Sequence, residues 1–195
     1  MRELLLGPKR FSDLRDSLPG ISANVLTQRL EGLEEVSIVR RSRLPPPAAS
    51  NVYELTEWGL ESEEMIKVIG RWAARSPYMA EGKPMSVNSV ILSFRTMFDA
   101  AKAADLNAAI GLRFGEDEFL ARISGGALDI SRDEADLGDA VLSCNQNALA
   151  AVVYGGVPLD KMIKAGEIKT TGKLPLVKRF CKLFPLPETA PELVV

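Results

Sequence analysis

The apolar positions near the start of the chain predict two short helices joined by a turn. Ser12 is placed to cap a first helix of about 13–18, which Pro19-Gly20 ends. Its apolar face carries Phe11, Leu14 and Leu18. Ser22 is placed to cap a second helix, whose apolar face has the i, i+4, i+7 spacing of Leu26, Leu30 and Leu33. Such a pair occurs in helical bundles and in helix-turn-helix units, and this pattern alone leaves both open.

Two β-prone runs follow the second helix. The basic run 38–44 and the run 52–56 flank a segment, 45–51, whose prolines exclude both helix and central strand. We interpret the two runs as a hairpin wing. A basic hairpin beside an exposed helix favours a DNA-binding unit over a plain bundle, because it places positive charge where phosphates would lie.

The candidate DNA contacts are the polar side chains of the second helix and the basic side chains around it. Amides and hydroxyls on an exposed helix can read base edges, whereas Lys and Arg neutralise phosphates. The candidates are Lys9, Arg10, Ser22, Asn24, Thr27, Gln28, Arg29, Arg41 and Arg43. Arg29 lies at the edge of its helix face and is either a phosphate ligand or the partner of a neighbouring acid. Along the strand, Arg41 and Arg43 project together, opposite Arg40.

The stretches 2–14, 20–30, 38–41 and 53–59 resemble the HxlR-type winged-helix transcription regulators, over about residues 1–76. The resemblance implies a homodimer that binds double-stranded DNA. The chain opens inside the family's first helix, so that helix is expected to be incomplete, with weaker DNA binding. Ser37 stands where the family often has Gly, so we expect a less sharply set turn into the wing. The cysteine near the N-terminus through which some members sense electrophiles is absent.

A longer helix is predicted after the wing. Thr56 is a good cap, and the pattern continues to about Arg75. The apolar stripe of this helix consists of Trp58, Met65, Ile69, Trp72 and Ala73. Such a stripe belongs either to the core or to a dimer seam, and the sequence leaves both open. Pro and Gly interrupt the pattern in 77–86, which we predict to be a linker.

Beyond the linker the periodicity changes from helical to alternating. After a helix of about 86–104, alternating segments within 106–130, broken by turns at 115–118 and 124–126, predict an antiparallel meander. The remaining predicted elements are a strand at 140–144, helices at 146–154 and 159–165, a strand at 167–171 and a helix at 174–184.

This order of elements, with the segments 135–137, 147–156, 165–172 and 177–184, resembles the sterol carrier protein fold over about residues 87–186, followed by a tail of 187–195. Members enclose an apolar tunnel, so the resemblance implies a hydrophobic small-molecule ligand. The candidate lining residues are Phe94, Phe98, Phe119, Leu149, Val153, Val177, Phe180 and Phe184. For each of them a plain core position is the favoured interpretation, because a domain of this size must bury such side chains to fold.

Composition narrows the function. The chain of 195 residues has no histidine, which removes the commonest general base and metal ligand. Cys144 and Cys181 lie far apart without a metal-ligand spacing, and the apolar neighbours of Cys181 favour a buried, reduced thiol there over a disulfide. We expect no enzymatic activity, no cofactor, no metal, no membrane segment and a cytoplasmic protein. The net charge is −2, so the basic clusters rather than a charge excess support DNA binding.

The predicted fold class is α+β, with an N-terminal winged helix-turn-helix and a C-terminal sterol-carrier-like antiparallel sheet packed with helices. We predict a dimeric transcription regulator whose C-terminal domain senses a hydrophobic molecule. The alternative is a lipid-binding or carrier protein in which the winged helix serves only in dimerisation.

Overall fold

The computed structural model describes residues 1–47, 49–78 and 84–191. They form two compact units, Met1–Ile66 and Lys67–Val195. The domain limits expected from the sequence, 1–76, 77–86, 87–186 and 187–195, stay a prediction. Residues 79–83 of the expected linker and 192–195 of the expected tail lie outside the described residues.

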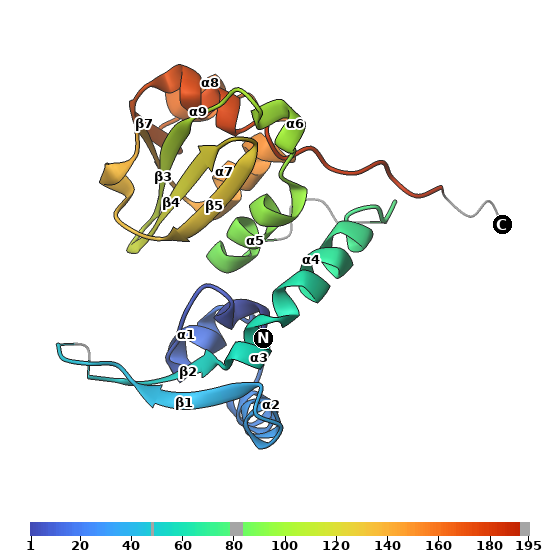
Figure 1. The fold of residues 1–195 in the computed structure, drawn as a ribbon, viewed down its shortest axis with the longest axis vertical. Coiled ribbons are helices and arrows are strands. Elements are labelled where there is room, and N and C mark those ends of the chain that lie inside the picture. Colours follow the sequence, from blue (N-terminus) through green and yellow to red (C-terminus); the bar gives the residue numbers. More distant parts are fainter. Residues whose placement is uncertain (48, 79–83, 192–195) are drawn as a thin grey trace. The chain divides into compact units, whose positions relative to one another are not determined.

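The first unit is a winged helix (Figure 1). Its elements are η1 (Arg2–Leu4), α1 (Phe11–Asp16), α2 (Ala23–Glu35), β1 (Val39–Arg43), β2 (Asn51–Leu55) and α3 (Glu57–Leu60), followed by α4 (Ser62–Ala73), which crosses into the second unit. Strands β1 and β2 form the expected hairpin, with a register that runs from Val39 opposite Leu55 to Arg43 opposite Asn51. Its core is made of Leu4, Leu14, Leu26, Leu30, Val39 and Val52.

Two of the three predicted helix caps in this unit are confirmed. The Ser22 hydroxyl accepts a hydrogen bond from the Val25 amide at 3.2 Å, and the Thr56 hydroxyl is the N-cap of α3. The predicted cap at Ser12 is wrong, because α1 already begins at Phe11. The Asp13 carboxylate reaches back to accept from the Arg10 amide at 3.2 Å, which satisfies an otherwise unpaired donor one turn earlier.

The long helix predicted after the wing is divided at Glu61 into α3 and α4. At the break the Ser62 hydroxyl donates to the Gly59 carbonyl at 2.6 Å, and so competes with the backbone for that acceptor. Gly59 itself lies against β1: a Cβ there would stand 2.3 Å from the Ile38 carbonyl oxygen. Only glycine permits this approach of helix to strand.

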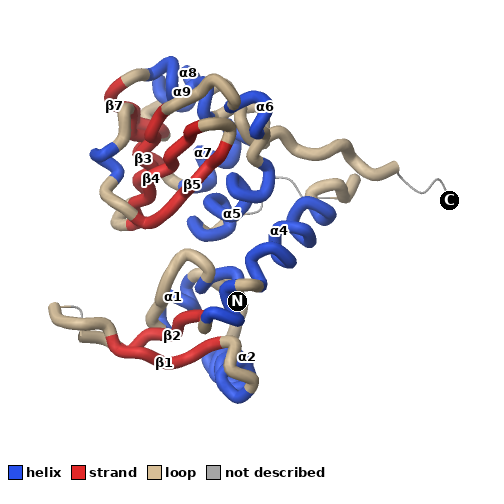
Figure 2. The backbone as a smooth tube through the Cα atoms, in the orientation of Figure 1, coloured by secondary structure: helices blue, strands red, loops and turns tan. Residues whose placement is uncertain are grey.

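The second unit contains helices and a five-stranded sheet (Figure 2). Its elements are α5 (Val87–Met97), α6 (Ala100–Ala103), β3 (Ala108–Phe114), β4 (Asp117–Ser124), β5 (Ala127–Arg132), η2 (Ala135–Leu137), β6 (Ala140–Cys144), α7 (Gln146–Val153), α8 (Leu159–Lys164), β7 (Ile168–Gly172) and α9 (Leu174–Phe180). Two predicted helices are shorter than expected: the one over 86–104 is divided where Asp99 caps α6, and the last ends at Phe180 rather than 184.

The strand order is β5-β4-β3-β6-β7; the meander predicted over β3, β4 and β5 is antiparallel as expected, but the sheet also contains one parallel pair. Strands β3 and β6 run parallel, with Ile110 opposite Ala140. The cause is the segment 133–139, which leaves the edge strand β5 and crosses the sheet to reach the other side of β3. A crossover returns the chain in its original direction, whereas a hairpin would reverse it.

The crossing segment lies directly on the sheet. A Cβ on Gly111 would stand 2.0 Å from the Ala135 carbonyl oxygen, so the close contact requires glycine. The Glu118 carboxylate accepts from the Ala135 amide at 2.8 Å, and Arg113 pairs with Asp136 at 2.8 Å. Among the residues that the structure describes, no helix is long and apolar enough to cross a membrane.

Candidate nucleic-acid interface

Helix α2 presents a polar outer face. Asn24, Gln28 and Arg29 are exposed on it, and Thr27 is half-buried at its margin. Ser22 is exposed as well, but its hydroxyl is occupied by the helix cap. The structure therefore brings the predicted base-reading side chains together on one helix, as the leucine spacing predicts.

The charged side chain of Lys9 is largely covered by the protein. Its ammonium lies 3.3 Å from the Glu3 carboxylate and donates to the Ser17 hydroxyl at 3.0 Å, and its side chain is only 14% exposed. Its backbone also exchanges two hydrogen bonds with Tyr53 of β2, at 3.0 and 2.8 Å. These contacts make Lys9 a part of the fold of this unit. Arg10 is exposed, and its Nε donates to the Ser50 hydroxyl beside the wing at 3.0 Å.

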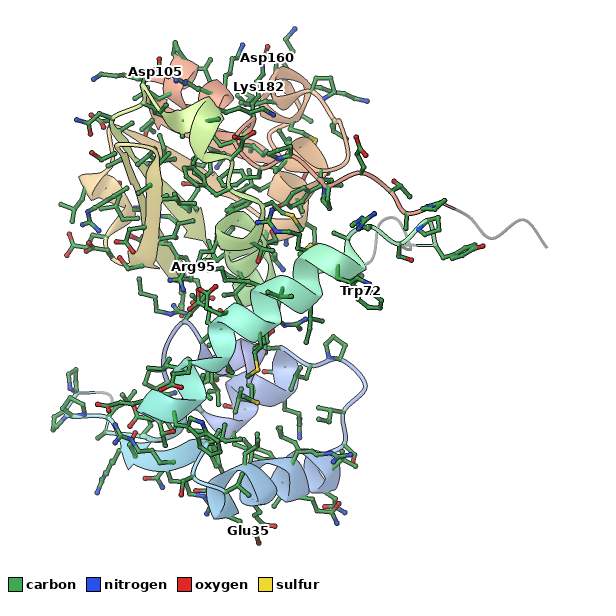
Figure 3. The ribbon with its side chains drawn as sticks, turned by 45° about the vertical axis from the view of Figure 1, so that its right-hand side comes forward. Glu35, Trp72, Arg95, Asp105, Asp160 and Lys182 are labelled. Atoms are coloured by element: carbon green, nitrogen blue, oxygen red, sulfur yellow. The ribbon has the colours of Figure 1, made fainter. Side chains whose placement is uncertain are left out.

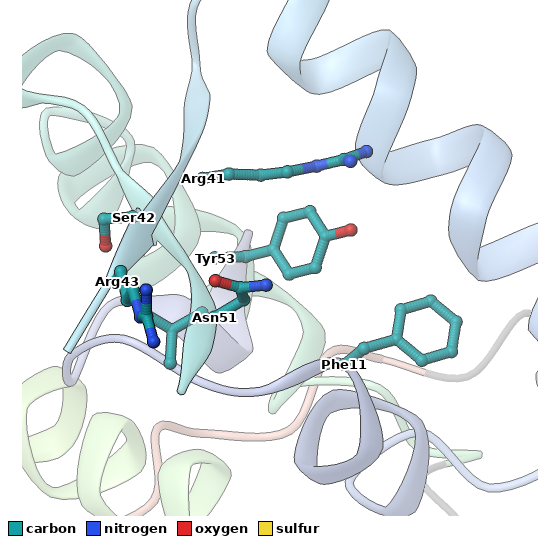
Figure 4. A pocket seen from close by; sticks show the side chains of 7 residues that line it. Phe11, Arg41, Ser42, Arg43, Asn51 and Tyr53 are labelled. Carbon is teal, nitrogen blue, oxygen red and sulfur yellow. The ribbon is translucent and has the colours of Figure 1, made fainter. Parts of the chain in front are cut away.

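A shallow hollow of about 500 Å³ lies between the wing and α1 (Figure 4). It is lined by Phe11, Arg41, Ser42, Arg43, Asn51, Val52 and Tyr53. The two arginines share this side of β1, while Arg40 pairs with Glu54 across the hairpin at 2.8 Å. The alternation predicted along the strand is thus present. Two guanidinium groups, an amide and two aromatic rings form a surface that suits an anionic ligand.

The two arginines of the hollow are held differently. The Arg41 guanidinium lies over the Tyr53 ring, 5.3 Å from its centre, and its Nε donates to the Glu34 carboxylate at 3.0 Å. Arg43 makes one long hydrogen bond, 3.4 Å from its Nε to the Ala49 carbonyl, among the residues described. The sequence did not identify Phe11, Asn51 and Tyr53 as lining residues. The strand register places Asn51 and Tyr53 opposite the arginines, and the fold of the unit brings the start of α1, with Phe11, to the same hollow.

The apolar stripe of α3 and α4 is exposed. Trp58 is 58% exposed, Met65 61%, Ile69 61% and Trp72 73%. Leu60, Val68 and Ala73 are exposed as well, and Figure 3 shows Trp72 standing out from α4. Of the two interpretations that the sequence left open, core or dimer seam, this exposure excludes the core of a single chain for these residues. An uncovered apolar surface of this size is typical of an interaction site.

Most of the predicted ligand-binding residues of the second unit pack against one another. The Phe94 ring stacks on Phe184 at 4.4 Å between centres, and Phe180 meets both rings edge-on, at 5.7 Å and 5.0 Å. Phe98 lies 6.2 Å from Phe184. Leu149 and Val177 are buried, and Val153 is half-buried. Contacts of this kind are those of a packed core.

Phe119 has no ring contact with this cluster among the described residues. It is buried on β4, with the Phe114 ring at 6.4 Å and the Arg132 guanidinium over its face at 4.8 Å. The role of the eight predicted lining residues in ligand binding stays a prediction.

Desolvation favours the neutral forms of two cysteines and one tyrosine of the second unit, of which Cys181 is buried and Cys144 and Tyr154 are half-buried. Burial raises the pKa of Cys144 and that of Cys181 to about 12, so both are thiols at neutral pH. Burial also raises the pKa of Tyr154, whose hydroxyl is hydrogen-bonded to that of Ser93 at 2.7 Å. The described residues include no group of three or more Cys, Asp and Glu side chains that could hold a metal ion.

Two family profiles divide the chain between them. The profile described as HxlR-like helix-turn-helix matches residues 1–81, and the profile described as alkyl sulfatase C-terminal matches residues 78–194. The HTH-type transcriptional regulator YodB of Bacillus subtilis (strain 168) is 37% identical over 70 residues, which are 36% of this chain and 62% of YodB. The structure of reduced YodB from B. subtilis is 33% identical, over 40% of this chain and 78% of that chain, with a TM-score of 0.36. The chain belongs to both families.

Solved structures similar to the alkyl sulfatase C-terminal part share much less sequence. The sec-alkylsulfatase Pisa1 from Pseudomonas sp. is 17% identical over 46% of this chain and 14% of that chain, with a TM-score of 0.43. The ubiquinone synthesis protein UbiJ-SCP2 is 16% identical over 67% of this chain and 93% of that chain, with a TM-score of 0.40. The HxlR resemblance seen in the sequence is confirmed, and sterol-carrier-type neighbours exist for the C-terminal part. Membership of the alkyl sulfatase C-terminal family was not foreseen.

Proposed function

We propose that this protein is a DNA-binding transcription regulator in which α2 reads base edges and the wing binds the DNA backbone. The observation that carries the proposal is the exposed polar face of α2, with Asn24 and Gln28, on a unit that also holds the arginine-lined hollow. The HxlR-like family membership and the similarity to YodB, itself a transcriptional regulator by name, support it.

The test is selection of duplexes from a random pool by the full chain, followed by footprinting on the selected sequence. We expect a preferred sequence protected as two half-sites about 10 base pairs apart, or a multiple of that spacing. Arg43→Ala should reduce the magnitude of the salt slope of binding by about 0.9, the value for one phosphate contact. Arg40→Ala is the matched control, because Arg40 is an exposed arginine of the same strand that pairs with Glu54 across the hairpin and does not line the hollow. Equal affinity for all sequences would contradict base reading by α2.

The proposed regulator is a homodimer that covers the apolar surface of α3 and α4 with a second copy. The support is the exposure of two tryptophans and several aliphatic side chains on adjacent helices. Trp72→Glu should convert the dimer to a monomer in analytical ultracentrifugation. Leu137→Glu is the control, because Leu137 is an exposed apolar side chain, at 58%, on a different element. If both variants keep the wild-type mass, another surface forms the dimer or the protein is monomeric.

For the C-terminal part we propose a hydrophobic, chain-like ligand that alters DNA affinity. The support is the membership of the alkyl sulfatase C-terminal family; the aromatic cluster around Phe94 is packed as a core and would have to open to admit the ligand. A ligand that binds one arrangement of the protein more tightly changes DNA affinity by that difference in binding free energy. Native mass spectrometry of the purified chain and titration with a fluorescent fatty acid test this part, and absence of binding in both would refute it.

The alternative is a lipid-binding or carrier protein whose winged helix serves only in dimerisation. It is favoured by the extent of the alkyl sulfatase C-terminal match, which covers residues 78–194 and thus the larger part of the chain. This alternative predicts a copurifying lipid and no duplex preference in the selection experiment, the reverse of the result expected for a regulator.

A further inference from the structure

The end of helix α2 is tied to the wing through one ion pair. The Arg41 Nε and Nη2 atoms each lie 3.0 Å from the same Glu34 carboxylate oxygen. The Arg41 guanidinium also rests on the face of Tyr53, at 5.3 Å (Figure 4). The Glu34 side chain is 24% exposed and that of Arg41 56%, so the pair is partly shielded from solvent.

These contacts distinguish Arg41 from Arg43, although both face the same hollow. Arg41 has its positive charge balanced by a carboxylate and its plane held by a ring, whereas Arg43 is held by one long hydrogen bond among the described residues. A DNA phosphate that approaches Arg41 meets the negative charge of Glu34 as well. The Nε and Nη2 donors of Arg41 are already engaged by Glu34, so a phosphate that takes these donors displaces a charge-assisted hydrogen bond.

We propose that Glu34 restrains the affinity of the wing for DNA by keeping Arg41 out of the phosphate contact. Glu34 is a positioning residue in this proposal, which rests on the DNA-binding function proposed above. Arg41 then braces the wing against α2, and Arg43 is the cation that meets the backbone. This assigns Arg41 a role different from that expected from the sequence, where it was grouped with the phosphate ligands.

The matched control for Glu34 is its neighbour Glu35. Glu35 lies on the same last turn of α2, and Figure 3 shows its side chain directed outward. Glu34→Gln and Glu35→Gln remove the same charge from adjacent positions, so a general electrostatic gain appears in both. Only Glu34→Gln releases Arg41. Arg41→Ala and the double variant Glu34→Gln/Arg41→Ala complete the set.

The experiment measures affinity for a random-sequence duplex by fluorescence anisotropy, in salt from about 50 to 200 mM. Glu34→Gln should raise the affinity for the duplex by about two- to fivefold, which corresponds to the free energy that an exposed ion pair contributes. It should also raise the magnitude of the salt slope by about 0.9, because one more phosphate is neutralised. Glu35→Gln should leave the slope unchanged. Arg41→Ala should leave it unchanged in the wild-type background and abolish the gain in the Glu34→Gln background.

The proposal would be overturned if the salt slopes of Glu34→Gln and Glu35→Gln were equal. It would also be overturned if Arg41→Ala lowered the salt slope in the wild-type background. Either result would leave the proposed DNA binding intact. If neither the wild-type chain nor Glu34→Gln binds any duplex, the proposed function fails as well. Thermal melting of each variant establishes that it is folded, and Glu34→Ala serves as a second test of the slope should Glu34→Gln be unstable.

Discussion

Ser37→Gly should stabilise the winged helix, because Ser37 has a backbone conformation that favours glycine. Its φ is 59°, in the left-handed region. The Ser37 amide donates to the Glu34 carbonyl at 2.9 Å, and the Ile38 amide donates to the Leu33 carbonyl at 2.9 Å. This is the Schellman pattern that ends helices, and its left-handed position is usually glycine.

The size of the effect follows from two opposing terms. A residue with a Cβ is disfavoured in the left-handed region by about 1–2 kcal/mol. Glycine loses about 0.5–1 kcal/mol more conformational entropy on folding. The Ser37 side chain is exposed and makes no hydrogen bond among the described residues, so its removal forfeits nothing else. The net expectation is a gain of about 0.5–1 kcal/mol.

For a unit of this size that gain corresponds to a rise in Tm of about 3–6 °C. Differential scanning calorimetry is the suitable measurement, because it can separate the transitions of two units that unfold independently. Ser37→Ala is the control, since alanine keeps the Cβ and should lie within about 0.5 kcal/mol of the wild type. A Tm for Ser37→Gly no higher than that for Ser37→Ala would refute the reasoning.

The other predictions concern the second unit and α2. Gly111→Ala should abolish or severely weaken folding in urea titrations, because its Cβ would stand 2.0 Å from the Ala135 carbonyl oxygen; a loss below 1 kcal/mol would mean that the crossing segment can shift. Gln28→Ala should cost about 1–3 kcal/mol on the selected DNA site but little on random DNA, and equal losses on both would remove it from base reading. The free energy of unfolding should fall as pH rises from about 9 to 12, because the thiols of the unfolded chain ionise in that range while those of the folded chain stay protonated. For the same reason Cys144 should react with iodoacetamide at pH 8 far more slowly in the folded chain than in urea. Equal rates would show that the fold does not shield this thiol. Phe180→Ala should change the affinity for a fluorescent fatty acid more than the Tm if the helix α9 lines a tunnel, whereas a stability loss of about 3–5 kcal/mol without probe binding would identify a packed core.

The local features of the chain could be predicted from its sequence because they depend on neighbouring residues. The helix caps at Ser22 and Thr56 are present as predicted, and the basic hairpin forms between the expected segments. The resemblance of the winged helix to the HxlR-type regulators could also be recognised from the sequence, because its motifs are short, occur in a fixed order and lie close together. A cap, a turn and an apolar period act over a few residues, so the local sequence is sufficient to specify them.

The candidate interface was predicted only in part. The exposed face of α2 followed from the spacing of its leucines, but the ion pairs of Lys9 with Glu3 and of Arg41 with Glu34 did not. Both pairs join side chains from different elements. Whether a basic side chain is available to a phosphate depends on which carboxylate the fold places beside it, and periodicity carries no information about that.

What the sequence by itself determined is therefore the kind and order of the elements, their caps and the faces they bury. Only the tertiary structure decided that β6 runs parallel to β3, that the segment 133–139 crosses the sheet over Gly111, and that the stripe of Trp58 and Trp72 is left exposed. The physical reason is that strand pairing, close backbone approach and burial each involve residues distant along the chain. Their outcome depends on how all the elements pack together.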